Sequence, residues 1–216
     1  MPYATAQFLQ DPLGFMQNNI IVPHHSDIGV DQRSARIHEL CLSKGGAQGK
    51  NLGRDLDVWI LRKRSDNDPG TEGFFGYWCP YNQNETLSCT LGNGARYMFT
   101  ATMDGCSFGV GSQTTGVCRV AHANEARFGA NKEQTFGLSG ARQFQRDEQQ
   151  QRLTSELGAN ASIINPLHYM PDIDNELVLK STTFGLHTLG RNWSFYTQRY
   201  WKNGNTYFLR EVTQQV

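Results

Sequence analysis

The chain lacks a net charge of either sign. Its 216 residues carry 20 Lys and Arg against 20 Asp and Glu, so the formal net charge is zero at pH 7. Nucleic acids and anionic membrane surfaces attract proteins mainly through a surplus of basic residues. The composition therefore argues against direct binding of nucleic acid and against a membrane-surface protein.

Long apolar runs are also absent. A membrane-spanning helix needs about 18 or more consecutive apolar residues, and the sequence has no such stretch. The first residues, MPYATAQFLQDPLGFMQNN, contain no basic segment and are interrupted by Pro12 and Gly14. They do not predict a Sec-type signal peptide, so we expect any export to use another route.

Paired cysteines and familiar metal-ligand patterns are missing as well. The cysteines are odd in number, scattered and without a CxxC pair, which favours free thiols in a reducing cytosol. They are Cys41, Cys79, Cys89, Cys106 and Cys118. The spacing of His24, His25, Asp27 and His38 fits no common metal site. We predict neither a metal nor another cofactor.

What the sequence does contain is glycine and aromatic residues, with 22 Gly, 12 Phe, 8 Tyr and 4 Trp. This composition is typical of a globular fold rich in strands and loops. Residue patterns predict helices at 31–45 and 139–158, and strands at 55–63, 73–78, 176–181, 192–201 and 205–212. We predict one domain, residues 1–216, of the α+β class. Its core would be a mixed, mainly antiparallel β-sheet sandwich with surrounding helices and long loops.

A further group of three strands is predicted at 97–103, 106–110 and 117–124. Asp104-Gly105 favours a two-residue hairpin turn between the first two, because both residues tolerate positive φ. Alternation places the following side chains of the last two strands on one face: Cys106, Phe108, Val110, Cys118, Val120 and His122. If this face is buried, pairing Phe108 with Val120 puts Cys106 opposite His122. Opposed Cβ atoms lie roughly 4.5–5.5 Å apart, within reach of a thiol–imidazole contact.

A Cys–His pair has a known chemical use. The imidazole of His122 can hold Cys106 as a thiolate, protonate a departing amine and later activate water to hydrolyse a thioester. Backbone N–H groups around Asp104, Gly105 and Cys106 are candidates for binding an oxyanion. Asn124 could orient the imidazole, although a role in capping the strand end explains it equally well. The sequence thus indicates acyl transfer at an amide.

Three short segments carry a resemblance to a known family: Phe99-Thr100, Met103-Asp104-Gly105-Cys106 and Val120-Ala121-His122. They resemble the glutamine deamidase toxins typified by the Burkholderia lethal factor, which are related to the catalytic domain of the cytotoxic necrotizing factors. In those toxins the cysteine closes a Leu-Ser-Gly-Cys motif and the essential histidine follows on a strand. In the lethal factor a threonine precedes the cysteine by six residues. The resemblance implies that Thr100, Cys106 and His122 are the catalytic residues.

The sequence departs from that family's pattern in two ways. Met103-Asp104 replaces Leu-Ser, which places a carboxylate beside the thiol and could raise its pKa. The spacing from Cys106 to His122 is also longer, which a longer loop can absorb. A regular hairpin would put Thr100 on the face opposite Cys106, so either a bulge intervenes or Thr100 supports the site from behind.

The resemblance implies a bacterial effector that acts in the host cytosol. It would convert one glutamine of a host protein to glutamate, as a protein-glutamine glutaminase. The target implied by the lethal factor is a translation-initiation RNA helicase, so that translation is blocked; the necrotizing factors imply a Rho-family GTPase. We expect a monomer. The alternatives are a transglutaminase or a cysteine protease that uses the same pair, and a non-catalytic binding module.

Overall fold

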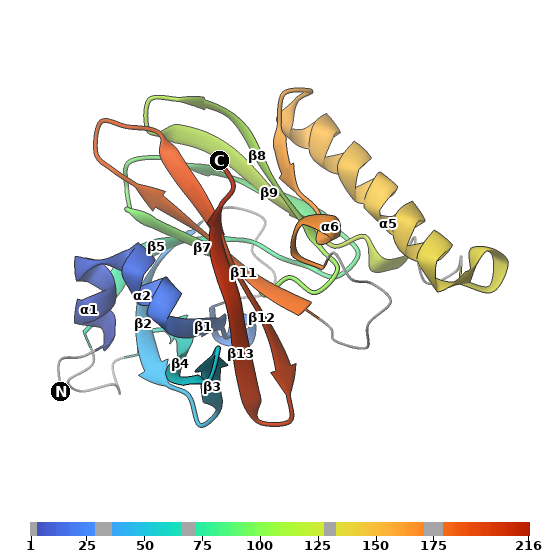
Figure 1. Ribbon diagram of the computed structural model, residues 1–216. Helices are drawn as coiled ribbons and strands as arrows, with labels where there is room; N and C mark the ends of the chain where they lie inside the picture. Colours follow the sequence, from blue (N-terminus) through green and yellow to red (C-terminus); the bar gives the residue numbers. More distant parts are fainter. Residues whose placement is uncertain (1–3, 29–35, 66–71, 128–132, 171–178) are drawn as a thin grey trace.

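The computed structural model describes residues 4–28, 36–65, 72–127, 133–170 and 179–216. Its strands form a nine-stranded and a four-stranded sheet, accompanied by five helices among the described residues (Figure 1). The helices are α1 (Ala4–Gln10), α2 (Pro12–Asn18), α3 (His25–Ile28), α5 (Glu133–Leu157) and α6 (Pro166–Tyr169). The fold is therefore α+β with mainly antiparallel sheets, as predicted.

The larger sheet has the strand order β1-β4-β2-β5-β7-β11-β12-β13-β3. In chain order its strands are β1 (Asn19–Pro23), β2 (Arg36–Lys44), β3 (Gln48–Asn51), β4 (Arg54–Lys63), β5 (Phe74–Cys79), β7 (Tyr97–Thr100), β11 (Leu179–His187), β12 (Trp193–Asn203) and β13 (Thr206–Gln214). The short strand β3 pairs with β13 in parallel and with β4 in antiparallel orientation. These two pairings close the sheet into a barrel.

The predicted sandwich is therefore wrong. Closure depends on β3, a four-residue strand that turns into β4 through Leu52 and Gly53, both at positive φ. Strand-forming residues specify that strands exist, but the partner of so short a strand is set by tertiary packing. The sequence pattern offered no means of distinguishing a closed barrel from two facing sheets.

The smaller sheet lies against the barrel and has the order β10-β8-β9-β6. Its strands are β6 (Thr86–Leu91), β8 (Ser107–Thr114), β9 (Val117–Ala123) and β10 (Ser162–Ile164). Helix α5 covers its outer face, where Leu153 packs against Ala121 and Ala123 (Figure 1). The helix predicted at 139–158 is thus confirmed, although it begins earlier, at Glu133, and bends at Gly137.

The hydrophobic core has two main parts, one on each face of β5 and β7. Tyr97 and Phe99 of β7 belong to a cluster with α1, α2 and the neighbouring barrel strands. Met98 lies on the other face, in a cluster shared with Phe108 and Val120 of the smaller sheet. Alternation along β7 therefore sends successive side chains into different cores, and the residue after Phe99 points toward the smaller sheet.

Two element predictions failed. The segment predicted as a helix at 31–45 contains strand β2 from Arg36 to Lys44, and residues 31–35 lie outside the described residues. Strand β2 pairs with both β4 and β5, and this long-range pairing outweighs the helical spacing of its apolar residues. The predicted hairpin between 97–103 and 106–110 is also wrong, since β7 belongs to the barrel and β8 to the smaller sheet.

The other strand predictions fared better. Strands at 55–63 and 73–78 are confirmed as β4 and β5, and the C-terminal hairpin is confirmed as β12 and β13. The hairpin turns at Gly204-Asn205, with Gly204 at φ 57°. Of the strand predicted at 176–181, residues 176–178 lie outside the described residues and β11 begins at Leu179.

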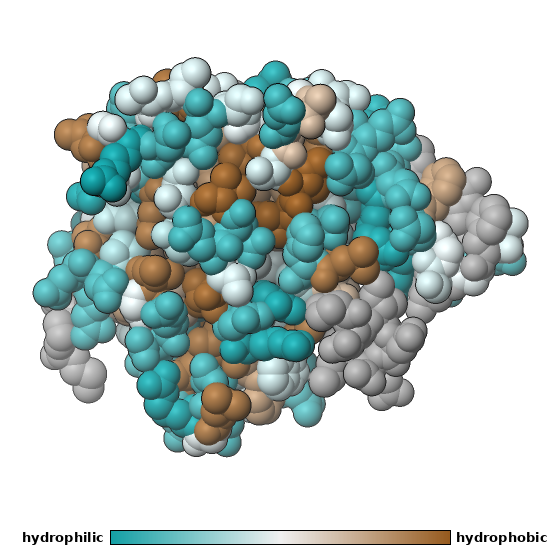
Figure 2. Space-filling view, turned by 45° about the horizontal axis from the view of Figure 1, so that its top comes forward, coloured by the Kyte–Doolittle hydropathy of each residue, from teal (hydrophilic) through white to brown (hydrophobic). Residues whose placement is uncertain are grey.

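The surface is mostly hydrophilic, with hydrophobic side chains gathered near the centre of one face (Figure 2). Large apolar side chains that protrude singly include Leu52 and Leu189, which lie in turns. Within the described ranges, every helix is too short or too polar to cross a bilayer.

Phe8→Ala is expected to lower the free energy of unfolding by about 3–5 kcal/mol, because it empties a fully buried site. The Phe8 ring contacts the rings of Phe74, Tyr97 and Phe99 and ties helix α1 to the barrel. Urea denaturation followed by circular dichroism measures the change. Leu189→Ala, at an exposed turn, is the control and should change stability by less than about 0.5 kcal/mol. Equal effects of the two substitutions would contradict the packing of α1.

Candidate active site

The candidate site lies where the barrel meets the smaller sheet. Thr100 ends β7 and is fully buried, and His122 on β9 is 1% exposed. Their side chains meet across the two sheets, with 2.6 Å between Thr100 Oγ1 and His122 Nδ1. The strand prediction left the side chain of Thr100 on the wrong face for this contact, because it assumed a hairpin. With β7 in the other sheet, Thr100 faces the imidazole directly.

The partners of Thr100 assign the protonation of the imidazole. Its hydroxyl also lies 3.4 Å from the backbone oxygen of Cys79, an acceptor to which it can donate its one proton. We therefore assign the proton to Nδ1 of His122, which donates to Thr100 Oγ1. His122 Nε2 then carries a lone pair, and it is buried without a hydrogen-bond partner. An imidazole in this tautomer can accept a proton at Nε2.

The register of β8 and β9 differs from the predicted one. Phe108 lies opposite His122 and Ser107 opposite Ala123, so the pairing is shifted by two residues. The prediction that Cys106 lies opposite His122 is therefore wrong. A shift of two keeps every side chain on its face, which is why burial alone could not exclude it. A bulge between Val110 and Gln113 accompanies the shift.

Asn124 follows β9 and contacts the thiol. Its Nδ2 lies 3.2 Å from Cys106 Sγ, while its Oδ1 accepts hydrogen bonds from the backbone N–H groups of Asn84 and Ala126. These two donors fix the orientation of the amide, so the group that faces the sulfur is an N–H donor. Asn124 thus caps the strand end, one of its two predicted roles. It contacts the cysteine rather than the imidazole.

Burial keeps both Cys106 and His122 uncharged. It raises the pKa of the Cys106 thiol to about 12, an effect that the Asn124 hydrogen bond partly offsets and the Asp104 charge reinforces. Burial likewise lowers the pKa of His122 to about 3. No hydrogen bond joins the thiol to the imidazole, because Nε2 has no partner. At neutral pH this conformation holds a thiol and a neutral imidazole rather than an ion pair.

The backbone before the cysteine supplies one donor to the thiol. The N–H of Asp104 forms a hydrogen bond to Cys106, which favours the thiolate. Gly105 has φ 125°, the positive φ expected there. Its N–H, however, donates to the hydroxyl of Tyr169, which in turn donates to the backbone oxygen of Cys106. Of the three predicted oxyanion donors, Asp104 is placed beside the sulfur, and the N–H of Gly105 is already used.

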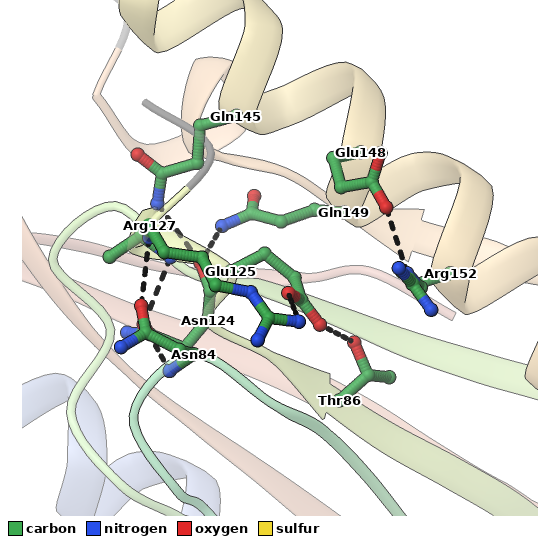
Figure 3. A network of polar contacts seen from close by, with 10 residues as sticks. Asn84, Thr86, Asn124, Glu125, Arg127, Gln145, Glu148, Gln149 and Arg152 are labelled. Carbon is green, nitrogen blue, oxygen red and sulfur yellow. Dashed lines mark hydrogen bonds and ion pairs between the residues drawn. The ribbon is translucent and has the colours of Figure 1, made fainter. Parts of the chain in front are cut away.

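A glutamine of α5 ties the strands around the thiol together. Gln149 is fully buried; its Nε2 donates to the backbone oxygens of Gly105 and Asn124, and its Oε1 accepts from the hydroxyl of Ser107. Figure 3 shows Gln145 and Gln149 reaching from the helix toward Asn124. The residues on both sides of Cys106 are thus fixed relative to Asn124.

A pocket of about 270 Å³ opens beside the thiol. Its lining combines the turn before the cysteine, the end of β9, one side of α5 and both ends of α6: Asp104, Gly105, Cys106, Asn124, Ala126, Arg142, Gln145, Arg146, Pro166 and Met170. A planar carboxamide group is small enough to enter a space of this size.

Sequence reasoning missed Tyr169 and Gln149 entirely. Both come from elements far along the chain, and neither lies in a recognisable motif, so no local signal could have found them. Asn124 could have been identified as the partner of Cys106, because it shares a strand face with His122. Elsewhere, His24 forms an exposed pair with Asp27 at 2.7 Å. In the part of the chain that the structure describes, no group of three or more His, Cys, Asp or Glu is arranged to hold a metal.

Asp104→Asn is expected to lower the pKa of Cys106, because removing a nearby negative charge favours the thiolate. The rate of Cys106 alkylation by iodoacetamide should be low at neutral pH and rise toward pH 12. Because Asp104 is half-exposed, we expect about a two- to fivefold faster reaction at a fixed alkaline pH. Asp147→Asn, on the exposed side of α5, is the control. A rate profile unchanged by Asp104→Asn would contradict the expected influence of that carboxylate.

Comparison with known proteins does not assign the chain to a family. No protein-family model matches the chain, and no curated protein matches it significantly. The function therefore has to be inferred from the chemistry of this site.

Proposed function

We propose that the protein is a protein-glutamine deamidase with Cys106 as its nucleophile. The observation that carries the proposal is a pair of contacts: Thr100 holds His122, and Asn124 holds Cys106, which lines the pocket. A cysteine, a base and a residue that orients the base are the groups that acyl transfer through a thioester requires. The deamidase assignment within this class comes from the family resemblance of the same residues.

The reaction begins with attack of the thiol on the substrate carboxamide. The thiol proton passes to His122 Nε2 as the C–S bond forms, and the carbonyl electron pair moves onto oxygen. Because burial disfavours a separate thiolate and imidazolium, we propose that proton transfer accompanies the attack. The N–H of Asp104 and Nδ2 of Asn124, which face the sulfur at rest, are the donors nearest to the oxyanion.

The second half of the reaction releases ammonia and then glutamate. The tetrahedral species collapses, the C–N bond breaks, and the leaving nitrogen takes the proton held at His122 Nε2. Water then gives a proton to Nε2 and attacks the thioester. The C–S bond breaks, and the sulfur regains its proton from His122. The net change replaces the amide nitrogen with oxygen and regenerates the enzyme.

The substrate is proposed to be a host protein, since the resemblance concerns toxins that act on host targets. The lethal factor type implies a translation-initiation RNA helicase, and the necrotizing factors imply a Rho-family GTPase. A carboxamide offers little to recognise by itself, so selection of one glutamine needs docking of the folded target. We propose that the protein reaches the host cytosol by a non-Sec route and acts there as a monomer.

The test is to incubate purified helicase and GTPase candidates with the wild-type protein, Cys106→Ser and Cys118→Ser. Cys118 is buried outside the pocket, so its variant controls for the loss of a thiol. Peptide mass spectrometry should detect a Gln-to-Glu conversion with wild type and Cys118→Ser but not with Cys106→Ser. Cleaved products would indicate a protease, and amine adducts a transglutaminase. Unchanged masses with tight binding would indicate a binding module and overturn the proposal.

A further inference from the structure

The segment that follows strand β5 lies against the candidate site. Cys79 ends β5, and its backbone oxygen lies 3.4 Å from the hydroxyl of Thr100. Pro80 comes next, and its ring restricts its own backbone φ. Tyr81 follows, and its half-buried side chain packs against both main parts of the hydrophobic core. The chain therefore places Tyr81 between these two parts, close to where Thr100 meets the smaller sheet.

The hydroxyl and the ring of Tyr81 contact different members of the site. The hydroxyl oxygen lies 3.3 Å from Asn124 Nδ2, which also lies 3.2 Å from Cys106 Sγ. An amide nitrogen carries two N–H groups, so Asn124 can donate one to each acceptor. The Tyr81 ring packs against the imidazole of His122, with 4.9 Å between the ring centroids and 58° between the planes. Tyr81 thus connects the partner of the thiol with the base.

The phenol of Tyr81 is uncharged at neutral pH. Burial raises the pKa of Tyr81 to about 12, and negative charge on Cys106 or Asp104 adds to this effect. The oxygen can therefore accept the N–H of Asn124 without placing a charge beside the thiol. Replacing the tyrosine with phenylalanine consequently removes a hydrogen bond and leaves the local charge unchanged.

We propose that Tyr81 is a positioning residue for the candidate site. Its hydroxyl holds the Asn124 amide against Cys106, and its ring holds the imidazole of His122. The inference rests on the proposed function for the use of these contacts, because there a proton passes from the thiol to the imidazole. Transfer between two groups depends on their relative placement, and small displacements lower the rate strongly. A side chain that contacts both the base and the partner of the nucleophile limits such displacements.

The contact with Asn124 can be tested without a substrate. The Asn124 hydrogen bond favours the thiolate of Cys106, so weakening it should raise the pKa of that thiol. We expect Tyr81→Phe to slow the alkylation of Cys106 by iodoacetamide about two- to fivefold at a fixed alkaline pH. Tyr77→Phe is the matched control, because the Tyr77 hydroxyl also accepts hydrogen bonds but lies outside both pockets near the thiol.

A double-mutant cycle tests whether Tyr81 acts through Asn124. Asn124→Ala should slow the alkylation by itself, and Tyr81→Phe added to it should have no further effect. Mass spectrometry follows the peptide that contains Cys106, and circular dichroism verifies that each variant is folded. An unchanged rate in Tyr81→Phe, an equal effect in both backgrounds, or an equal effect of Tyr77→Phe overturns the proposal.

The contact with His122 is tested by nuclear magnetic resonance of its ring, which does not depend on the Asn124 variant. Tyr81 lines a second pocket, of about 320 Å³, so removing its ring lets water approach the imidazole from this side. Because burial lowers the pKa of His122, Tyr81→Leu should raise that pKa by about one to two units. Tyr81→Phe keeps the ring and should leave it near the wild-type value. Equal pKa values of His122 in wild type and Tyr81→Leu overturn the proposed role of the ring.

Kinetics on a responsive target connect this inference with the proposed function. We expect Tyr81→Phe to lower kcat about three- to tenfold with little change in KM, because the hydroxyl holds the reacting groups and not the substrate. Tyr77→Phe should keep the wild-type kcat. A change in KM alone, or an unchanged kcat, overturns the proposal. If the thiol and the imidazole respond as expected but no target is deamidated, the proposed function fails and the positioning role of Tyr81 stands.

Discussion

Thr100→Val is expected to lower the deamidation rate about 10²–10⁴-fold with little change in KM. Valine keeps the shape and β-branching of threonine but removes the hydroxyl that bonds to His122 Nδ1. The buried Nδ1–H then loses its acceptor, so no hydrogen bond holds the imidazole in the tautomer and orientation that leave a lone pair on Nε2. Molecules in which Nε2 is protonated or the ring has turned cannot accept the thiol proton. Steady-state kinetics on a responsive target measures the loss.

Thr100→Ser is the matched control, because it retains the hydroxyl and loses only a methyl group. Its activity should stay within about tenfold of wild type. Nitrogen chemical shifts of the His122 ring report the tautomer directly, even before a substrate is identified. Wild type and Thr100→Ser should carry the proton on Nδ1, and Thr100→Val should lose this preference. An imidazole protonated at Nε2 in the wild type would refute the assigned role of Thr100.

Gln149→Glu is expected to destabilise the fold by about 3–5 kcal/mol at neutral pH. The substitution preserves shape, but it aims a carboxylate at the backbone oxygens of Gly105 and Asn124, where Gln149 now donates. Burial and these two acceptors both favour the protonated acid. Urea denaturation measures the change in the free energy of unfolding, and Gln143→Glu on the exposed face of α5 is the control.

The pH dependence gives Gln149→Glu a distinctive signature. Its carboxyl pKa is expected to be higher in the folded than in the unfolded state, whose value is about 4.3. The variant should therefore be most stable below that pH, and lose stability as the pH rises from there through the folded-state pKa. Gln143→Glu should show no such loss. A Gln149→Glu variant as stable as wild type at pH 7 would show that the hydrogen bonds of Gln149 to Gly105 and Asn124 contribute little to the stability of the fold.

The sequence supported predictions where a pattern was both local and repeated. Alternation and Asn-Gly turn chemistry identified the β12–β13 hairpin, and a long polar segment ending at Gly158 identified α5. The segment that forms β2 was wrongly predicted as a helix, because its apolar spacing also suits a helix. It forms a strand because it pairs with β4 and β5. Closure of the barrel could not be predicted for the same reason, because it depends on the long-range pairing of β3 with β13 and β4.

For the site, the sequence narrowed the choice of residues but not their partners. Burial patterns placed Cys106 and His122 on one face of the smaller sheet. The register shift of two residues keeps both side chains on that face. It puts Asn124, instead of His122, opposite the thiol. The contact of Thr100 with His122 required knowing that β7 and β8 lie in different sheets. Resemblance nominated Thr100 without supplying that geometry.

The bond from Thr100 to His122 has a consequence for how the protein responds to partial unfolding. Its two ends belong to separate sheets, so any loosening of one sheet against the other breaks it while leaving both ladders of strand hydrogen bonds intact. Elements of a protein often open at lower free energy than the whole. The proposed deamidase activity should therefore disappear at lower denaturant concentrations than the far-ultraviolet circular dichroism of the strands. Loss of activity would then report the separation of the two sheets before either sheet unfolds.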